Sequence, residues 1–273
     1  MVRLRRPCLR LAFVAALVGI VFFAVDPVRA APPADSLATS RTAPFTVDGQ
    51  VALHSFMALS DGHLQELADM LRLLAATDDA RSGTWERIRE PLAGVSAMTV
   101  PAVLWFAEPK GAYWTLHEGR AAGNLSDRPY FPRVLGGTAV IGDLVVSRST
   151  NRNTAVVAVP VRRDDQGVVG VLGASVHLDS LGAIVRREMG GLEGGFLFFS
   201  IDSKPMGAIH SDPSLIFTEP MQLGDEAMRR AFLEILSRTE GTVTYTFRGA
   251  PRTMIYRKSP VTGWWYAVGV ARD

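Results

Sequence analysis

The fold class of this chain can be judged from the stretch TAVVAVPVRRDDQGVVGVLGASV, residues 154–176. Its two apolar halves, residues 154–161 and 168–176, are separated by the turn sequence Asp164-Asp165-Gln166-Gly167. Turn residues between two apolar runs are typical of a β-hairpin. Another apolar run precedes the hairpin at residues 139–146 and predicts a further strand. The stretch and its upstream neighbour therefore predict three antiparallel strands in succession.

The order of predicted elements occurs twice along the chain. Upstream, residues 100–106 and 112–117 predict two strands, and residues 129–135 predict a short helical piece before the three strands. Residues 178–188 return to helical spacing and lead into the second half. There the predicted elements are strands 196–201 and 206–210, helix 226–236, and strands 241–247, 252–258 and 264–270. This repeated order predicts two PAS-like lobes in an α+β fold.

A long amphipathic helix is predicted in front of both lobes. Between residues 51 and 74, apolar residues recur at three- and four-residue steps. Asp61-Gly62 interrupts this pattern and weakens the expectation of one continuous helix. A shorter second helix is expected over residues 84–92. The predicted architecture is a long N-terminal helix followed by two antiparallel-sheet lobes.

The N-terminus has the composition of an export signal. Four arginines within the first ten residues precede an apolar run at residues 11–25. This run is short for a membrane-spanning helix, which needs about 20 apolar residues. Residues 1–30 are therefore interpreted as a signal peptide cut after Ala30, and residues 31–46 as a flexible leader. The alternative is an uncleaved helix that anchors the chain to the inner membrane. Either way, the remainder is expected in the periplasm or outside the cell.

The basic character of the chain belongs to that signal. The whole chain has a net charge of +2, but residues 1–30 contain five arginines and one acidic residue. Residues 31–273 consequently carry a net charge of −2, which gives no support for nucleic-acid binding. Cys8 is the single cysteine and also lies in the signal, so the exported part is expected to hold no disulfide.

The segment Asp127-Arg128-Pro129-Tyr130-Phe131 resembles the pocket loop of Cache domains, the extracytoplasmic sensor modules of bacterial chemoreceptors and histidine kinases. In that family the loop has the form aspartate-arginine-x-aromatic-aromatic. Other segments similar to the family follow in the same order at residues 140–143, 147–150, 158–161, 167–171 and 178–181. The resemblance implies a double Cache domain. Its parts would be an N-terminal helical segment (47–97), a membrane-distal Cache lobe (98–188) and a second PAS-like lobe (189–273).

The resemblance also implies that Arg128 and Tyr130 contact a ligand. Their chemistry suits this role, since a guanidinium presents a planar fork of donors to a carboxylate or phosphate, and a tyrosine offers a ring face and a hydroxyl. We expect Tyr113 on the facing strand and Ser147 after the central strand to complete a small pocket. In the alternative interpretation, Arg128 caps the following helix or pairs with Asp127.

Departures from the family pattern bear on the ligand. Amino-acid-binding double Cache domains are similar to one another in an arginine-x-tryptophan-tyrosine loop, a tyrosine five residues earlier, and a last-strand aspartate that holds the ligand's ammonium. Here the loop has Tyr130-Phe131, Gly123 stands five residues before Arg128, and Ser175 stands where that aspartate would be. A serine cannot balance an ammonium charge, so the expected ligand is a small organic anion, such as a carboxylate. His117 and His177 fall on strands that are expected to face the pocket, where either imidazole could make a pH-sensitive contact.

The sequence contains no recognisable catalytic or metal-binding motif. The five histidines form no His-x-x-x-His or His-Glu-x-x-His spacing, and no nucleophile elbow, phosphate loop or dinucleotide fingerprint occurs. We therefore expect no enzymatic activity, no cofactor and no metal.

The expected function is extracytoplasmic sensing. Because no output segment follows Asp273, the signal is expected to pass through a separate membrane receptor or kinase. Three alternatives stay open: a periplasmic solute-binding protein that delivers its ligand to a transporter, a secreted hydrolase, and an interaction module with an empty pocket.

Overall fold

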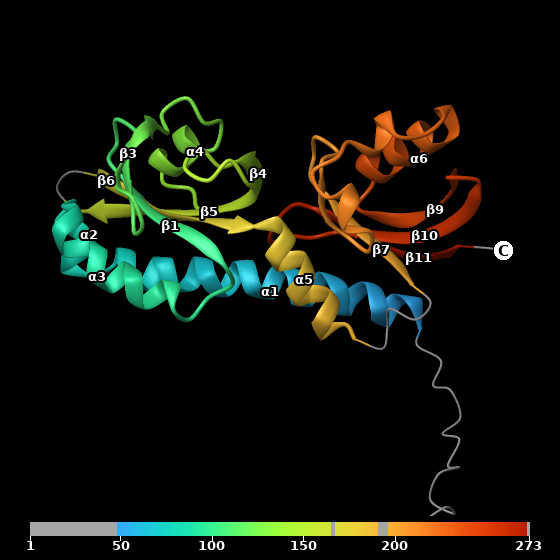
Figure 1. Cartoon of the computed structure of the whole chain (residues 1–273), viewed down its shortest axis with the longest axis horizontal. Coiled ribbons are helices and arrows are strands. Elements are labelled where there is room, and N and C mark those ends of the chain that lie inside the picture. Colours follow the sequence, from blue (N-terminus) through green and yellow to red (C-terminus); the bar gives the residue numbers. More distant parts are fainter. Residues whose placement is uncertain (1–47, 165–166, 191–195, 272–273) are drawn as a thin grey trace, which may run out of the picture. The chain divides into compact units, whose positions relative to one another are not determined.

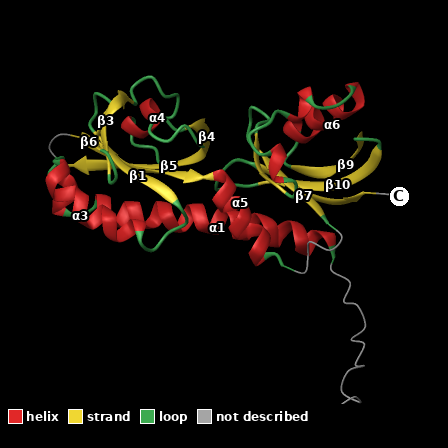
Figure 2. Cartoon of the chain, viewed as in Figure 1, coloured by secondary structure: helices red, strands yellow, loops and turns green. Residues whose placement is uncertain are grey.

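A computed structural model of the chain describes residues 48–164, 167–190 and 196–271 (Figure 1). The predicted signal peptide at residues 1–30, the leader at 31–46 and two residues of the predicted hairpin turn, 165 and 166, lie outside the described residues. All described residues belong to one unit, Thr46–Asp273. Two antiparallel sheets and the helices that pack on them make up this unit, which confirms the predicted α+β class (Figure 2).

The first sheet contains six strands in the order β3-β2-β1-β6-β5-β4. Its strands are β1 (Ala102–Ala107), β2 (Ala112–Thr115), β3 (Gly119–Asn124), β4 (Val140–Val146), β5 (Asn153–Arg163) and β6 (Gly167–His177). β5 and β6 form the long central hairpin that the apolar stretch predicts, with Thr154 opposite His177 and Val161 opposite Gly170. Nearly every residue along this hairpin's centre is buried, and the hairpin is flanked by β1 on one side and by β4 on the other.

The second sheet contains five strands in the order β8-β7-β11-β10-β9. Its strands are β7 (Leu197–Ile201), β8 (Gly207–His210), β9 (Glu240–Phe247), β10 (Ala250–Lys258) and β11 (Trp265–Ala271). The last strand returns to pair with β7, as β6 returns to pair with β1 in the first sheet. The repeated strand order predicted from the sequence is thus reproduced by the sheet topology.

Helix α1 (Gly49–Ala75) runs without a break through the predicted interruption. Its N-cap is Asp48, whose carboxylate accepts the backbone N–H groups of Gln50 and Val51. The helix packs on β5 of the first sheet and on β10 and β11 of the second (Figure 1). Asp61 does not end the helix because its side chain is buried against the second sheet, where hydroxyl groups satisfy it. One apolar helix face therefore serves both sheets.

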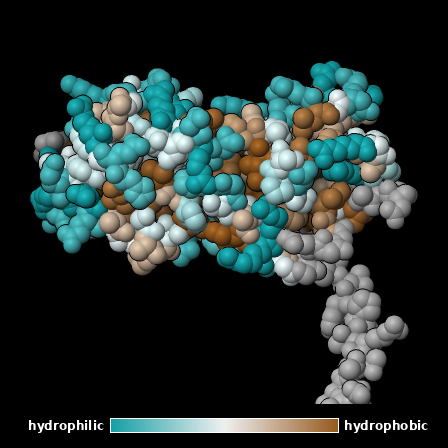
Figure 3. Space-filling model, in the orientation of Figure 1, coloured by the Kyte–Doolittle hydropathy of each residue, from teal (hydrophilic) through white to brown (hydrophobic). Residues whose placement is uncertain are grey.

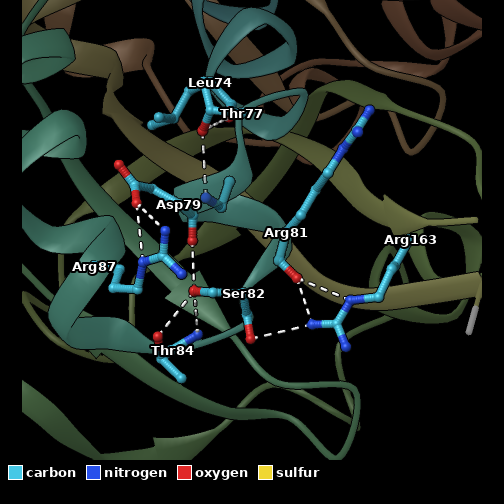
Figure 4. A network of polar contacts seen from close by, with 9 residues as sticks. Leu74, Thr77, Asp79, Arg81, Ser82, Thr84, Arg87 and Arg163 are labelled. Atoms are coloured by element: carbon cyan, nitrogen blue, oxygen red, sulfur yellow. Dashed lines mark hydrogen bonds and ion pairs between the residues drawn. The ribbon is translucent and has the colours of Figure 1, made fainter.

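Two short helices follow α1, and hydrogen bonds link them to each other and to the end of β5. They are α2 (Asp78–Arg81), which the sequence pattern did not predict, and α3 (Trp85–Ser96). Asp79 accepts two hydrogen bonds from Arg87, and the guanidinium of Arg163 on β5 donates to the backbone carbonyls of Arg81 and Ser82 (Figure 4). Charged groups at a helix C-terminus satisfy carbonyls that lack helical partners.

Each sheet is covered on its other face by its own helical segment. On the first sheet this cover includes α4 (Phe131–Leu135), whose Phe131 and Val134 are buried on that face. On the second sheet it includes two short 3-10 turns, η2 (Pro213–Leu215) and η3 (Pro220–Gln222), and helix α6 (Glu226–Ser237). Helix α5 (Leu178–Glu188) connects the two sheets and packs in the core shared with α1.

The region after β2 differs from the prediction. The sequence pattern predicts that this strand extends to His117 and predicts no further strand before residue 129. In the structure β2 ends at Thr115, His117 lies in a turn, and Gly119–Asn124 form the edge strand β3. Only Ala121 of β3 is buried, so the strand owes its extended form to pairing with β2 rather than to an apolar pattern.

Candidate functional site

The predicted Cache-like loop closes a small pocket on the outer face of the first sheet. We call it the arginine pocket. Its lining residues are Trp105, Tyr113, Leu125, Arg128, Tyr130, Val145, Ser147, Arg148, Ser149 and Ser175. Five of the six predicted site residues, from four separate parts of the chain, therefore meet at one place.

Aromatic side chains form the floor of the arginine pocket. The indole Nε1 of Trp105 donates to the hydroxyl of Ser175 at 3.3 Å, and the Tyr130 ring lies 6.4 Å from that of Trp105 between centroids. Gly173 on β6 makes room for this indole, because a Cβ atom there would lie 2.2 Å from the Trp105 ring. Tyr113 and Tyr130 are both buried. Ser175 thus has a structural partner in addition to its place in the pocket wall.

Two arginines hold the loop over this floor. Arg128 donates from Nη2 to the carbonyl of Val146 at 2.8 Å, so it neither caps α4 nor pairs with Asp127. Arg148 instead pairs with Asp127 at 2.5 Å and donates to the carbonyl of Asn124. The loop is therefore tied down by an arginine that the sequence analysis did not select.

The electrostatics of the arginine pocket favour an anion. Among its described lining residues the charged groups are Arg128 and Arg148, and none is acidic. Asp127 stays outside the lining, and its hydrogen bond to Arg148 lowers the pKa of its carboxyl group. Burial raises the pKa of Tyr130 and of Tyr113, so both hydroxyls are protonated at neutral pH and can donate a hydrogen bond. The pocket thus offers cationic and neutral donors together.

The arginine pocket is nearly filled by its own side chains. Its free volume is about 20 Å³, room for roughly one water molecule. A ligand of metabolite size needs the loop to move. Because Arg148 bridges Asn124 and Asp127, a bound anion that took over the Arg148 guanidinium would release this loop. Arg148 therefore both holds the loop closed and is a candidate to bind the anion.

His177 lies apart from the arginine pocket. It stands at the N-cap position of α5, and its Nδ1 is 2.9 Å from Nη1 of Arg152, which also pairs with Asp179. Burial, and then the charge of Arg152, lower the pKa of His177, so its imidazole is neutral at neutral pH. The structure thus gathers Arg128, Tyr130, Tyr113, Ser147 and Ser175 and leaves His177 at the end of the first sheet.

The described residues offer little other chemistry. No group of three or more His, Cys, Asp or Glu side chains there is placed to hold a metal ion. Likewise, none of the helices formed by residues 48–164, 167–190 and 196–271 combines the length and the apolar character that crossing a bilayer requires.

The class of fold follows from this architecture: a long helix, two PAS-like sheets with returning last strands, and a loop-covered pocket match the double Cache fold. No protein-family model and no curated protein sequence matches the chain.

Solved structures with the same fold do match. One is the ligand-binding domain of the Pseudomonas aeruginosa PAO1 amino acid chemoreceptor PctB in complex with L-Arg, at a TM-score of 0.63 and 15% identity over 82% of this chain and 92% of that chain. Another is the ligand-binding domain of the Pseudomonas fluorescens chemoreceptor CtaA in complex with L-alanine. Its TM-score is 0.62 and its sequence identity 15%, over 82% of this chain and 94% of that chain. An extracellular ligand binding receptor from Desulfohalobium retbaense matches at 0.63 and 13% over 81% of this chain. This chain spans 40% of that receptor's length.

Proposed function

We propose that this chain is an extracytoplasmic sensor that binds a small organic anion, such as a carboxylate, in the arginine pocket. The observation that carries the proposal is the convergence of Arg128 and Arg148 on a pocket whose described lining contains no acidic side chain. Planar guanidinium groups bind carboxylates through paired, charge-assisted hydrogen bonds. Tyr113, Tyr130 and Ser147 would supply neutral donors around the rest of the ligand.

An α-amino acid is the second candidate ligand, because the PctB and CtaA domains were solved with L-Arg and L-alanine. Such a ligand carries an ammonium group that needs an anionic or multiply accepting partner once it is desolvated. In the arginine pocket Ser175 stands at the position where the family pattern has an aspartate for the ammonium group. The Ser175 hydroxyl already accepts a hydrogen bond from the indole N–H of Trp105. We therefore rank a carboxylate without an ammonium group above an amino acid.

Binding can be transmitted through contacts that join the two sheets. Trp264, which precedes β11, donates its indole N–H to the carbonyl of Gly142 on β4 at 2.8 Å. Pocket residue Val145 lies on the same strand as Gly142. A loop that opens beside β4 would thereby shift the equilibrium between two arrangements of the sheets, which a partner could detect.

The placement of the protein belongs to the same proposal. Residues 1–30 would direct export, residues 31–46 would form a leader, and residues 47–97 would form the N-terminal helical segment. Residues 98–188 would form the ligand-binding lobe and residues 189–273 the second lobe. A membrane receptor or kinase would receive the signal, and the chain itself would catalyse no reaction.

A thermal-shift screen tests the proposal. The panel contains small carboxylates and the common amino acids, with Arg128→Met as the test variant. Arg133→Met is the matched control, since Arg133 pairs with Asp143 outside the arginine pocket. A ligand at 100 times its dissociation constant adds about 2.7 kcal/mol of stability, which raises the melting temperature by about 5–10 °C at about 2–4 °C per kcal/mol for a chain of this size. We expect a carboxylate to shift the wild type and Arg133→Met, but not Arg128→Met.

Other outcomes would favour the alternative functions. Turnover of the bound compound by purified protein would establish a hydrolase. Capture of a permease, in place of a receptor or kinase, would favour a solute-binding protein. If no compound shifts the melting temperature, the interaction module with an empty pocket becomes the better explanation.

A further inference from the structure

The second sheet has a cavity of its own, in the place that corresponds to the arginine pocket. It lies between the outer face of the second sheet and the cover formed by η2, η3 and α6. Residues from β7, β8, β9 and β10 form one wall, and residues from the cover form the other. We call it the second-sheet cavity. The repeated topology thus places a cavity under the cover of each sheet.

An unusual set of polar groups lines this otherwise apolar cavity. Arg252 on β10 lies over the ring of Phe247, 4.6 Å from its centroid, and its Nε is buried without a hydrogen-bond partner in the described part of the chain. Buried donors are almost always satisfied in folded proteins, so an unpaired guanidinium nitrogen beside a cavity calls for an acceptor. Tyr245 stands directly opposite Arg252 in the strand register and also lines the cavity.

His210 presents a second donor on the same wall. Its Nδ1 accepts the backbone N–H of Asp212 at 2.8 Å, so the neutral ring carries its proton on Nε2. Burial keeps this imidazole neutral by lowering its pKa to about 4, and the nearby guanidinium groups of Arg252, Arg248 and Arg186 act in the same direction. The region therefore carries three cationic groups beside His210, opposed by the Asp212 carboxylate.

The remaining lining is hydrophobic. Phe199, Phe232, Met228 and Leu215 enclose the cavity, and no acidic side chain is among its described lining residues. Apolar walls with a few convergent polar groups are the usual composition of a small-molecule site. A ligand that matches this composition has an apolar body and one anionic group.

We propose that the second-sheet cavity is a second binding site, which takes a small monocarboxylate with an aromatic or branched apolar body, with Arg252 holding the carboxylate. His210 and Tyr245 donate to the same group, and the ring of Phe232 packs on the apolar body. This site is separate from the arginine pocket and does not depend on the function proposed for it.

Access to the site runs through the cover. The free volume of the cavity is about 20 Å³, which holds roughly one water molecule, so a ligand must displace part of the cover. The part of the cover that precedes α6 should open more easily than the sheet. It consists of two short 3-10 turns, and Phe217 between them has a φ of 60°, a left-handed conformation that costs energy for a non-glycine residue. Leu223 lines the cavity and is 44% exposed, and hydrophobic residues reach the surface around α6 in Figure 3.

The test uses 4-fluorobenzoate as the probe and its amide, 4-fluorobenzamide, as an uncharged analogue. Binding to the purified full chain is followed by fluorine NMR. We expect Arg252→Met to weaken 4-fluorobenzoate binding at least tenfold, because a charge-assisted hydrogen bond is lost. Arg252→Lys, which keeps the charge but not the fork, should bind with intermediate affinity. The matched control is Arg248→Met, since Arg248 also lies over the Phe247 ring, at 5.0 Å, but does not line the cavity.

A second measurement needs no change to the arginine. Met228 lines the cavity, so its labelled methyl signal, assigned with Met228→Leu, should shift on addition of 4-fluorobenzoate to the wild type. Three results would overturn the proposal: no shift of that methyl signal, equal affinity of wild type and Arg252→Met, or equal affinity for the amide. Loss of probe binding in Arg128→Met but not in Arg252→Met would place the probe in the arginine pocket and also overturn it.

Discussion

The buried carboxylate of Asp61 should contribute strongly to the stability of the contact between α1 and the second sheet. It accepts hydrogen bonds from the hydroxyls of Ser259 at 2.5 Å, Tyr266 at 2.7 Å and Thr262 at 3.1 Å. Asp61→Ala leaves the Ser259 and Tyr266 hydroxyls buried without their acceptor, whereas Thr262 is half-buried and nearer to water. A buried donor left unsatisfied costs about 1–3 kcal/mol.

Two such donors give an expected loss of about 2–6 kcal/mol, which is reduced by the relief of the buried charge. That charge has a real cost, since burial raises the pKa of the Asp61 carboxyl despite its three hydroxyl partners. We therefore expect Asp61→Ala to lower the free energy of unfolding by about 3 kcal/mol. Asp61→Asn should lose less, because the amide oxygen still accepts.

Urea unfolding followed by tryptophan fluorescence measures this loss. Asp69→Ala is the matched control, because Asp69 lies on the same helix but is exposed and pairs with Arg72 at the surface. Exposed pairs contribute at most about 1 kcal/mol. If Asp61→Ala costs no more than Asp69→Ala, the carboxylate does not fasten the helix to the second sheet and the reasoning is wrong.

Three further predictions concern His210, Asp127 and Gly173. The pKa of His210 is about 4 in the folded protein and about 6.5 in the unfolded chain. Between pH 4 and about pH 6.5 the unfolded state therefore binds more protons than the folded state. Stability should therefore fall as pH drops through this window, by about 3 kcal/mol in total, and urea unfolding at pH 7 and 4.5 should show a smaller fall for His210→Gln. Asp127→Asn removes the carboxylate that competes for Arg148, so carboxylate affinity measured by calorimetry should rise about two- to fivefold; unchanged or lower affinity would contradict a closing role for the pair. Gly173→Ala drives a methyl group into the Trp105 ring, and thermal unfolding should show a loss of about 1–3 kcal/mol; a neutral result would mean that the indole can shift freely.

Most of the fold was predictable from patterns that burial imposes on the sequence. The helical spacing of residues 178–188 corresponds to α5, Leu178–Glu188, and the apolar run 139–146 corresponds to β4, Val140–Val146. β3 was not predictable in this way, because it is a polar edge strand that only its pairing with β2 keeps extended. The continuity of α1 through Asp61 was also hidden, since the partners of that carboxylate lie about 200 residues away in the sequence.

The candidate site was predictable where a local motif marked it. The loop with Arg128 and Tyr130 was selected by its resemblance to Cache domains, and the structure places it over a pocket. Arg148 was missed as a pocket residue, because its approach to Asn124 depends on how the turn after β4 folds back. The available signal was its position beside Ser147 in a segment already similar to the family.

The central claim, that two arginines make this pocket an anion sensor, is tested most directly by calorimetric titration of carboxylates and L-alanine. The titrations use the wild type, Arg128→Met and Arg148→Met. We predict that a carboxylate without an ammonium group binds the wild type more tightly than L-alanine does. We also predict that each substitution weakens this binding at least tenfold, as loss of a charge-assisted hydrogen bond requires. Tighter binding of L-alanine, or carboxylate binding that both substitutions leave unchanged, would contradict the claim.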